Sequence, residues 1–295
     1  PDTKFTAKAL QKTNLSVQII TKLNRSALVT GKKALILPPL GRSEIDLQNQ
    51  VEQFVTTENS MGNVQMSKGV LSPASKDLRS EVWIVCELAK AVLGKTWDEF
   101  ANDYNKIREA IERTINGFEN YNERVRKNGG FYLPNQPRIG EFPTHNGKAN
   151  FSTNDLTIRK LEPDQFLLMT IRSHDQFNTT IYALDDRYRG IKNERRVIFL
   201  NPEDMREFGL KSGNVVDLTS HFEGETRHAN HFIAVPYAIP KRCAATYFPE
   251  ANSLVPIRSV AEKSNTPTSK SVVITIVKNG NEQVGKFKYD FLARE

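Results

Sequence analysis

The sequence predicts a chain of two parts, an incomplete open α/β region followed by a small closed β-barrel. Within the first 95 residues, short β-branched runs alternate with helical patterns. From residue 161 onward the pattern changes to short β runs separated by turn residues. A strand, a short capped helix, a glycine turn and another strand follow one another over residues 196–219, a compact unit typical of small barrels.

The first part is predicted to hold few strands. Its elements are, in order, a helix at 6–11, strands at 15–20 and 34–37, and a hairpin of 51–57 with 62–67. We expect strand 15–20 to be buried, and Pro38 and Pro39 to end the next strand. Gly62 supplies the turn of the hairpin. Two strands and a hairpin are too few for a complete doubly wound sheet.

Two helices are predicted next. Residues 78–93 form the first, which Gly94 ends. Its expected core face is Val82, Val85, Leu88, Ala89 and Val92. The second begins at a capping box of Thr96 and Glu99. Its apolar residues recur at helical spacing over 97–111, which favours core packing over a cofactor contact.

A linker and the barrel follow. Residues 128–154 are rich in Gly, Pro and Asn, which indicates a linker, with a hairpin expected between Phe142 and Phe151. The barrel strands are predicted at 166–171, 196–200, 215–219, 231–235 and 271–277. Between the second and third, Asn201 is a good N-cap and Gly209 a good helix stop.

Composition excludes several classes of protein. Hydrophobic residues make up 38% and charged residues 25%, enough apolar material for real cores. No window approaches the roughly 18 apolar residues of a membrane span, so we expect no membrane partner. Cys86 and Cys243 are too few for a four-thiolate cluster within this chain, and they suit a reducing, cytoplasmic location. The first residue is not Met, so we expect a processed chain or a fragment.

The net charge of +7 and the pI of 9.3 favour anionic partners, either nucleic acid or a phosphate-bearing cofactor. Aromatic and basic residues do not interleave as they do in nucleic-acid-binding surfaces. The phosphate-binding glycine motifs of dinucleotide and nucleoside triphosphate sites are also absent from the sequence. The five histidines do not have the spacing of a metal site.

Two polar stretches are candidate binding sites. The first, 170–190, follows an apolar strand and offers the donors Arg172, Ser173, His174, Gln176, Asn178 and Thr179. The second, 243–270, places flat Tyr247 and Phe248 near polar Asn252 and Lys270, which suits a planar hydrogen-bonding ring. The alternatives are a solvated loop for the first stretch and a surface connection for the second. Asp185-Asp186 is interpreted as a turn and Arg195-Arg196 as a strand flank.

Long motifs of this chain resemble one known family. These are LLMTIRSHDQFNTTIYALDDRYRG, VIFLNPEDMREFGLKSGNVVDLTSHF, YFPEANSLVP with SNTPTSKSVVITI, KLNRSALVTGKKALILPPLGRSEID and SPASKDLRSEVWIVCELAKAVLG. They are similar to the C-terminal part of a bacterial molybdopterin oxidoreductase alpha subunit. The similarity is greatest to the formate-dehydrogenase-like branch of the dimethyl-sulfoxide-reductase superfamily.

The resemblance implies a fold and cofactors. Residues 1–127 would be the trailing, Rossmann-like part of an α/β domain, 128–154 a linker, and 155–295 a six-stranded double-psi β-barrel that binds molybdopterin dinucleotide. The cofactor would be bis-molybdopterin guanine dinucleotide with molybdenum. The family's 4Fe–4S cluster and molybdenum ligand would lie in a missing N-terminal part, so the fragment alone would be inactive.

The resemblance also implies site residues and partners. Cofactor contacts carried over residue by residue are Arg172, Ser173, His174, Gln176, Asn178, Asn252 and Lys270, with Tyr247 and Phe248 flanking a pterin and Thr21 and Lys22 near a guanosine. An acidic residue is common in the family where Thr21 stands. Partners would be the N-terminal domains of the same subunit and a small-molecule substrate. The alternatives are a basic nucleic-acid-binding module and a small hydrolase that uses Cys243.

Overall fold

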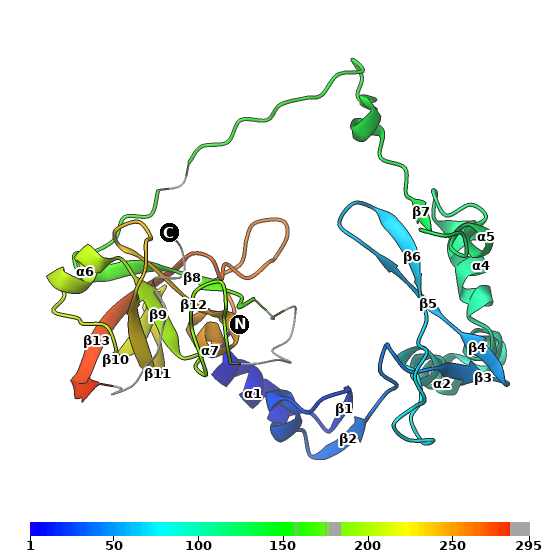
Figure 1. Cartoon of the computed structure of the whole chain (residues 1–295), viewed down its shortest axis with the longest axis horizontal. Helices are drawn as coiled ribbons and strands as arrows, with labels where there is room; N and C mark the ends of the chain where they lie inside the picture. The colour runs from blue at the N-terminus through cyan, green and yellow to red at the C-terminus, as the bar shows by residue number, and fades with distance from the viewer. Residues whose placement is uncertain (157, 175, 177–183, 284–295) are drawn as a thin grey trace. The chain divides into compact units, whose positions relative to one another are not determined.

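The computed structural model describes residues 1–156, 158–174, 176 and 184–283, and divides the chain into two compact units. One unit combines Pro1–Thr13 with Leu156–Glu295, and the other is Asn14–Asp155. The first unit contains the barrel (Figure 1). The grouping differs from the predicted boundaries because the first thirteen residues belong with the barrel rather than with the α/β part.

Six strands close into a barrel in the order β10-β11-β9-β12-β8-β13. They are β8 (Gln165–Ile171), β9 (Val197–Leu200), β10 (Asn214–Phe222), β11 (Glu225–Pro236), β12 (Cys243–Tyr247) and β13 (Val272–Gln283). Two neighbouring pairs are parallel, β8 with β12 and β9 with β11, and the other four are antiparallel. Five of these strands were predicted. The strand β12 was not predicted, because the two consecutive alanines Ala244 and Ala245 have low β propensity.

Apolar residues of the barrel unit form two buried clusters. The larger cluster includes Phe166, Leu168, Leu218 and Ile274, all essentially inaccessible to solvent. A smaller cluster joins Phe199, Val235 and Tyr247 to neighbouring residues. β9 is buried at all four positions, as expected for a strand that is covered on both faces. The strands are therefore held in one register by close packing.

Short helices lie beside the barrel strands (Figure 1). They are α1 (Thr3–Gln11), α6 (Pro202–Glu207), α7 (Phe248–Ala251) and the 3-10 turn η4 (Asn252–Leu254). The prediction of a capped helix at 201–209 is confirmed: the Asn201 side chain accepts a hydrogen bond from the Glu203 N–H at 2.8 Å. Gly209 has φ +64°, which explains why glycine follows the helix.

Residues before α1 tie it to the barrel. Asp2 is buried, and its carboxylate accepts a hydrogen bond from Arg227 Nε at 2.8 Å. The backbone N–H of Asp2 also donates to the Val255 carbonyl at 2.7 Å. These contacts reach across more than two hundred residues of sequence, so no local pattern could predict them.

The other unit contains small separate sheets instead of one open sheet. Its strands are β1 (Leu15–Ile19), β2 (Lys33–Leu37), β3 (Asp46–Gln48), β4 (Val51–Gln53), β5 (Val55–Glu58), β6 (Asn63–Ser67) and β7 (Phe131–Tyr132). β1 and β2 form a parallel pair, β3 and β4 an antiparallel pair, and β5-β6-β7 a three-stranded sheet. The predicted hairpin of 51–57 with 62–67 is confirmed in part: β5 pairs with β6, whereas residues 51–53 form β4 and pair with β3. Phe54, Val64, Tyr121, Val125 and Phe131 form the core.

The helices of this unit depart from prediction in two ways. They are α2 (Glu81–Leu93), α3 (Asp98–Asn102), α4 (Tyr104–Thr114) and α5 (Tyr121–Arg124), with 3-10 turns η1 (Arg25–Leu28), η2 (Lys95–Trp97) and η3 (Gln136–Ile139). The predicted single helix over 97–111 breaks at Asp103, whose side chain caps α4. In α2, Val85, Leu88 and Val92 are exposed, and Ile84 and Cys86 are the buried residues.

Two other expectations in this unit are wrong. β1 was expected to be buried, but Leu15 and Val17 are exposed. Residues 141–155, all of them described, contain turns and no strand, so the hairpin between Phe142 and Phe151 does not form. Within the described part of the chain, every helix is too short or too polar to cross a membrane.

Limited digestion with trypsin should cut first after Lys148, Arg159 or Lys160. Residues 141–156 and 158–160 are almost all exposed and have no regular structure, so a protease can bind them in extended form. Mass spectrometry of the products should give two fragments that meet within 141–160. Loss of the barrel strands before any cut in this segment would contradict the division into units.

Candidate functional site

Two segments that are distant in sequence meet at one end of the barrel. β8 and β12 are parallel, and Ile171 at the end of β8 pairs with Tyr247 at the end of β12. Because paired parallel strands end on the same side, the loop that follows β8 and the turn that follows β12 start side by side. The two candidate stretches of the sequence therefore meet in one place.

Lys270 joins the same end of the barrel. It precedes β13, which runs antiparallel to β8, and its Nζ donates to the carbonyl oxygen of Thr170. Burial, and then the charge of Arg172, lower the pKa of Lys270. Two cationic side chains are thus held within electrostatic range of each other, an arrangement that an anion would stabilise.

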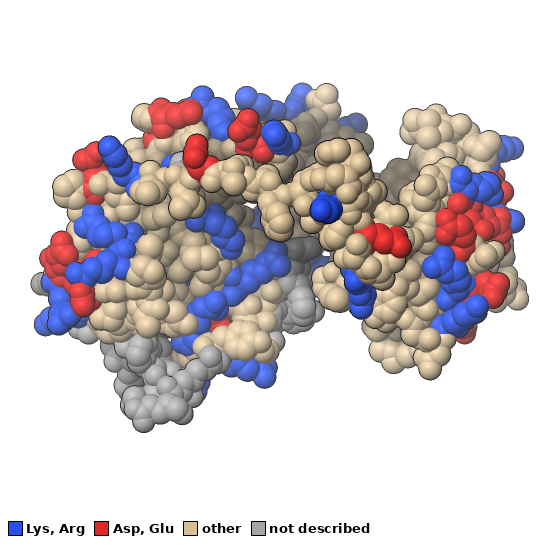
Figure 2. Space-filling view, turned by 90° about the horizontal axis from the view of Figure 1, so that it is seen from above, with Lys and Arg blue, Asp and Glu red and all other residues tan. Residues whose placement is uncertain are grey.

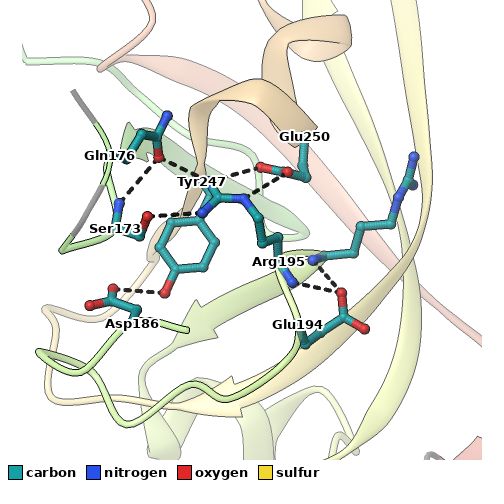
Figure 3. Close-up of polar contacts among 8 residues, drawn as sticks. Ser173, Gln176, Asp186, Glu194, Arg195, Tyr247 and Glu250 are labelled. Carbon is teal, nitrogen blue, oxygen red and sulfur yellow. Dashed lines mark hydrogen bonds and ion pairs between the residues drawn. The ribbon is translucent and has the colours of Figure 1, made fainter. Parts of the chain in front are cut away.

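Arg195 is the centre of a buried polar network (Figure 3). It is 5% exposed, and its Nε lies 3.0 Å from Oε1 of Glu250 in an ion pair. Its Nη1 donates to Ser173 Oγ at 2.9 Å, and its Nη2 donates to Gln176 Oε1 at 2.8 Å. One guanidinium therefore links the loop after β8 to α7 after β12.

The buried side chain of Tyr247 packs against Arg195 at the centre of this network. The Arg195 guanidinium carbon lies 4.7 Å from the centre of its ring, and the ring packs edge-on against Phe199. Its hydroxyl donates to Asp186 Oδ2 at 2.8 Å, and Arg189 Nη1 lies 2.7 Å from the same oxygen. Burial and the Asp186 carboxylate raise the pKa of Tyr247 above its usual range. Tyr247 is thus a neutral, fully buried support.

Gln176 carries an orphaned polar group. It is 6% exposed, and its Oε1 accepts from the Ser173 N–H at 3.2 Å as well as from Arg195. Its Nε2 is buried and has no hydrogen-bond partner among the described residues. Buried N–H groups are nearly always paired, so this amide is a candidate ligand contact.

The structure brings some of the predicted residues together. Arg172, Ser173 and Gln176 lie after β8, and the Arg172 guanidinium carbon is 5.8 Å from the Phe248 ring centre. His174 packs edge-on against Tyr188 with ring centres 4.3 Å apart. Asn252 is half-buried at the start of η4.

The remaining predicted residues differ from these in burial or in the compact unit to which they belong. Tyr247 was expected to flank a pterin, but its ring is fully buried between Arg195 and Phe199, so stacking on a ligand would require these side chains to move. Thr21 and Lys22 are exposed in a bend after β1, within the other compact unit. Asn178 and Thr179 lie outside the described residues.

Sequence analysis missed Arg195, Glu250 and Asp186. Arg195 was interpreted as a strand flank and Asp186 as part of a turn, and each is in fact a buried charge with an opposite partner. Charge in a turn is ordinary, so composition carries no signal of this burial. The one available signal was chemical: Glu250 lies two residues after the aromatic pair Tyr247-Phe248, at the end of a strand.

Positive charge, and no cluster of metal ligands, characterises the described part of this unit. Among the described residues, the acidic, His and Cys side chains form no group of three or more that could hold a metal ion. Figure 2 shows Lys and Arg side chains spread over the visible face of the barrel unit, with Asp and Glu in smaller groups. The site is therefore suited to binding an anionic organic ligand through hydrogen bonds and positive charge.

Comparisons with known proteins agree with a site that binds an anionic organic ligand. Residues 166–273 match the family model of the molybdopterin dinucleotide binding domain. The chain is 48% identical over 286 residues to an uncharacterized oxidoreductase of Mycobacterium tuberculosis, covering 94% of this chain and 37% of that protein. It is 38% identical over 285 residues to protein YdeP of Escherichia coli, covering 94% of this chain and 38% of YdeP.

A solved structure shares the fold. Acetylene hydratase from Pelobacter acetylenicus superposes with a TM-score of 0.53 at 14% identity, over 83% of this chain and 38% of that one. The chain thus spans well under half the length of these relatives.

Replacing Tyr247 by Phe should lower the free energy of unfolding at pH 7 by about 1.5–3 kcal/mol, because a buried hydrogen bond to a carboxylate is lost. The raised pKa of Tyr247 means that its contribution is complete below about pH 10 and declines above it, as tyrosine in the unfolded chain ionises. The difference between the two proteins should therefore narrow above pH 10. Denaturant titrations over a pH series measure both effects.

The matched control is Tyr237→Phe, since the Tyr237 ring also packs on Phe199 but its hydroxyl makes no hydrogen bond to a described residue. This variant should change stability by well under 1 kcal/mol. Equal losses of unfolding free energy in the two variants would show that the Tyr247–Asp186 hydrogen bond does not stabilise the protein.

Residues 166–273 are thus similar to the molybdopterin dinucleotide binding domain, and 94% of the chain is similar to part of an uncharacterized oxidoreductase.

Proposed function

We propose that this chain holds a molybdopterin dinucleotide at the end of its barrel and forms part of an oxidoreductase. One observation carries the proposal: Arg172, the Gln176 amide and Lys270 converge at the shared end of β8 and β12, inside the range that matches the dinucleotide binding domain. The oxidoreductase relatives support the same conclusion.

The residues present fit such a cofactor. Its pyrophosphate needs cations and N–H donors, which Arg172 and Lys270 supply. Its pterin and guanine rings carry carbonyl and nitrogen acceptors, which suit the neutral amides of Gln176 and Asn252. The orphaned, buried Gln176 Nε2 is the observation of this structure that favours a missing acceptor.

The bound group would supply two-electron redox chemistry at molybdenum. The residues of this chain would bind and orient it. A phosphate beside Lys270 would offset the lowered pKa of the ammonium and keep its proton on Nζ. Phe248, close to Arg172, would exclude water from one side of the ligand. We assign no catalytic acid or base to this chain.

We further propose that the chain is the C-terminal part of a longer, formate-dehydrogenase-like subunit. Bis-molybdopterin guanine dinucleotide would bind there, with a 4Fe–4S cluster in the N-terminal domains, a small-molecule substrate and a cytoplasmic location. The relatives are more than twice as long as the matched region, which supports further domains. Two parallel strand pairs within one closed six-stranded barrel support the double-psi topology.

Exposed apolar surface supports the same proposal. β1 and β2 form a parallel pair, a type of sheet that is normally buried on both faces. Leu15, Val17 and Leu35 of this pair are exposed, as are Val85, Leu88 and Val92 of α2. We propose that other domains of the same subunit cover these faces.

In the complete subunit, Arg172→Ala should lower the bound pterin by about ten- to a hundredfold, because a charge-assisted contact contributes roughly 1.5–3 kcal/mol. Arg172→Lys should restore part of the binding, since it keeps the positive charge but loses the planar guanidinium that can donate two parallel hydrogen bonds. Pterin is measured as its fluorescent oxidation product after purification from a host that makes the cofactor.

Arg196→Ala is the control, because the Arg196 guanidinium contacts the Asn230 carbonyl and lies outside the Arg195 network. This control should keep wild-type pterin content. A wild-type subunit that carries no pterin would contradict the proposed function, and salt-sensitive binding to duplex DNA would favour the nucleic-acid alternative.

A further inference from the structure

Arg195 is a fully compensated buried cation. The residue is 5% exposed, and the Glu250 carboxylate accepts from Arg195 Nε at 3.0 Å and lies 3.4 Å from Nη2. An isolated buried charge is strongly unfavourable, and the Glu250 carboxylate compensates the positive charge of Arg195 in this position. The ion pair holds the Arg195 guanidinium in one orientation. In this orientation Nη1 and Nη2 both donate to side chains of the loop after β8.

That direction determines how the Gln176 amide is oriented. Two N–H donors, Arg195 Nη2 at 2.8 Å and the Ser173 backbone at 3.2 Å, converge on Gln176 Oε1. A flipped amide would place its own N–H groups against these two donors. The oxygen is therefore committed to Arg195 and Ser173, and Figure 3 shows the amide nitrogen of Gln176 directed away from them.

The amide nitrogen of Gln176 remains available to donate a hydrogen bond. Gln176 Nε2 is buried and makes no hydrogen bond to a described residue. Buried N–H donors are nearly always paired in proteins, so a site that holds an unpaired donor in a fixed direction is prepared for an acceptor.

We propose that Arg195, held by Glu250, is a positioning residue that fixes Gln176 so that its amide N–H donates to an oxygen acceptor of the bound cofactor. The inference rests on the proposed function above and adds to it a residue that need not touch the ligand. It also specifies the chemistry of the contact: an oxygen that accepts a hydrogen bond from a neutral amide.

Gln176→Glu separates this role from a merely structural one. The substitution keeps an oxygen for Arg195 and Ser173 and adds a countercharge, so the fold of the loop should be retained. It replaces the free N–H donor by an acceptor, so binding of an acceptor oxygen should be lost. If the network served structure alone, the variant would bind the cofactor as well as wild type does.

The experiment compares wild type, Gln176→Glu, Arg195→Lys and the double variant in the complete subunit. Thermal denaturation reports the fold, and the fluorescent pterin product reports bound cofactor. Gln176→Glu should keep the wild-type melting temperature and lose at least tenfold in pterin content. Arg195→Lys should also lose pterin, and the double variant should be no worse than the poorer single variant, because both changes remove the same contact.

Arg196→Lys is the matched control, since this neighbouring arginine donates to Asn230 instead of the network. It should leave pterin content and melting temperature unchanged. Full pterin content in Gln176→Glu would overturn the positioning role alone. Pterin-free wild type would overturn the proposed function and this inference with it.

A second measurement covers the case in which Gln176→Glu fails to fold. In the 295-residue chain labelled with ¹⁵N at glutamine side chains, the Gln176 amide signal should be shifted from the random-coil position. Arg195→Lys should move it to that position, and Arg196→Lys should not. An unchanged Gln176 signal in Arg195→Lys would overturn the positioning role without any reference to the cofactor.

Discussion

The parallel pairing of β8 with β12 is the constraint on which the site depends. With Ile171 opposite Tyr247, both strands end together, and the segments that follow them share one end of the barrel. Closure of the sheet fixes the remaining neighbours, so that Lys270 before β13 reaches the same end. A slip of one residue in this register would turn the buried Leu168 outward, and the packed barrel core would be lost.

The buried charges at this end are arranged as matched pairs. Arg195 faces Glu250, and Arg189 faces Asp186, with the ring of Tyr247 between the two pairs. Replacing such pairs by apolar residues is often neutral or stabilising, so stability alone does not explain why they are here. Their effect is geometric, because each pair holds a loop backbone and a donor group in one orientation. Lys270 is different: its lowered pKa marks a cation placed beside another cation, which costs stability until an anion arrives.

The two units differ in how completely they bury their apolar residues. In the barrel unit, Phe199, Leu218 and Phe232 are inaccessible to solvent. In the other unit, exposed leucines and valines lie on both a strand pair and a helix, and small sheets replace one continuous sheet. Helical periodicity identified α2 as amphipathic, yet Val85, Leu88 and Val92 on the predicted core face are exposed. Periodicity reports that a face is apolar and does not report what covers it.

The sequence by itself determined the local elements. Short β runs separated by turn residues predicted five of the six barrel strands, and Asn201 with Gly209 predicted the ends of α6, because these signals act over a few residues. Composition also pointed to an anionic ligand, and the polar stretches at 170–190 and 243–270 were recognised before their proximity was known. Only the tertiary structure decided which strands are neighbours, that Tyr247 is a buried support, and that Arg195 and Glu250 pair across 55 residues. Burial and pairing depend on contacts between distant segments, and the charge of a residue in a turn carries no record of them.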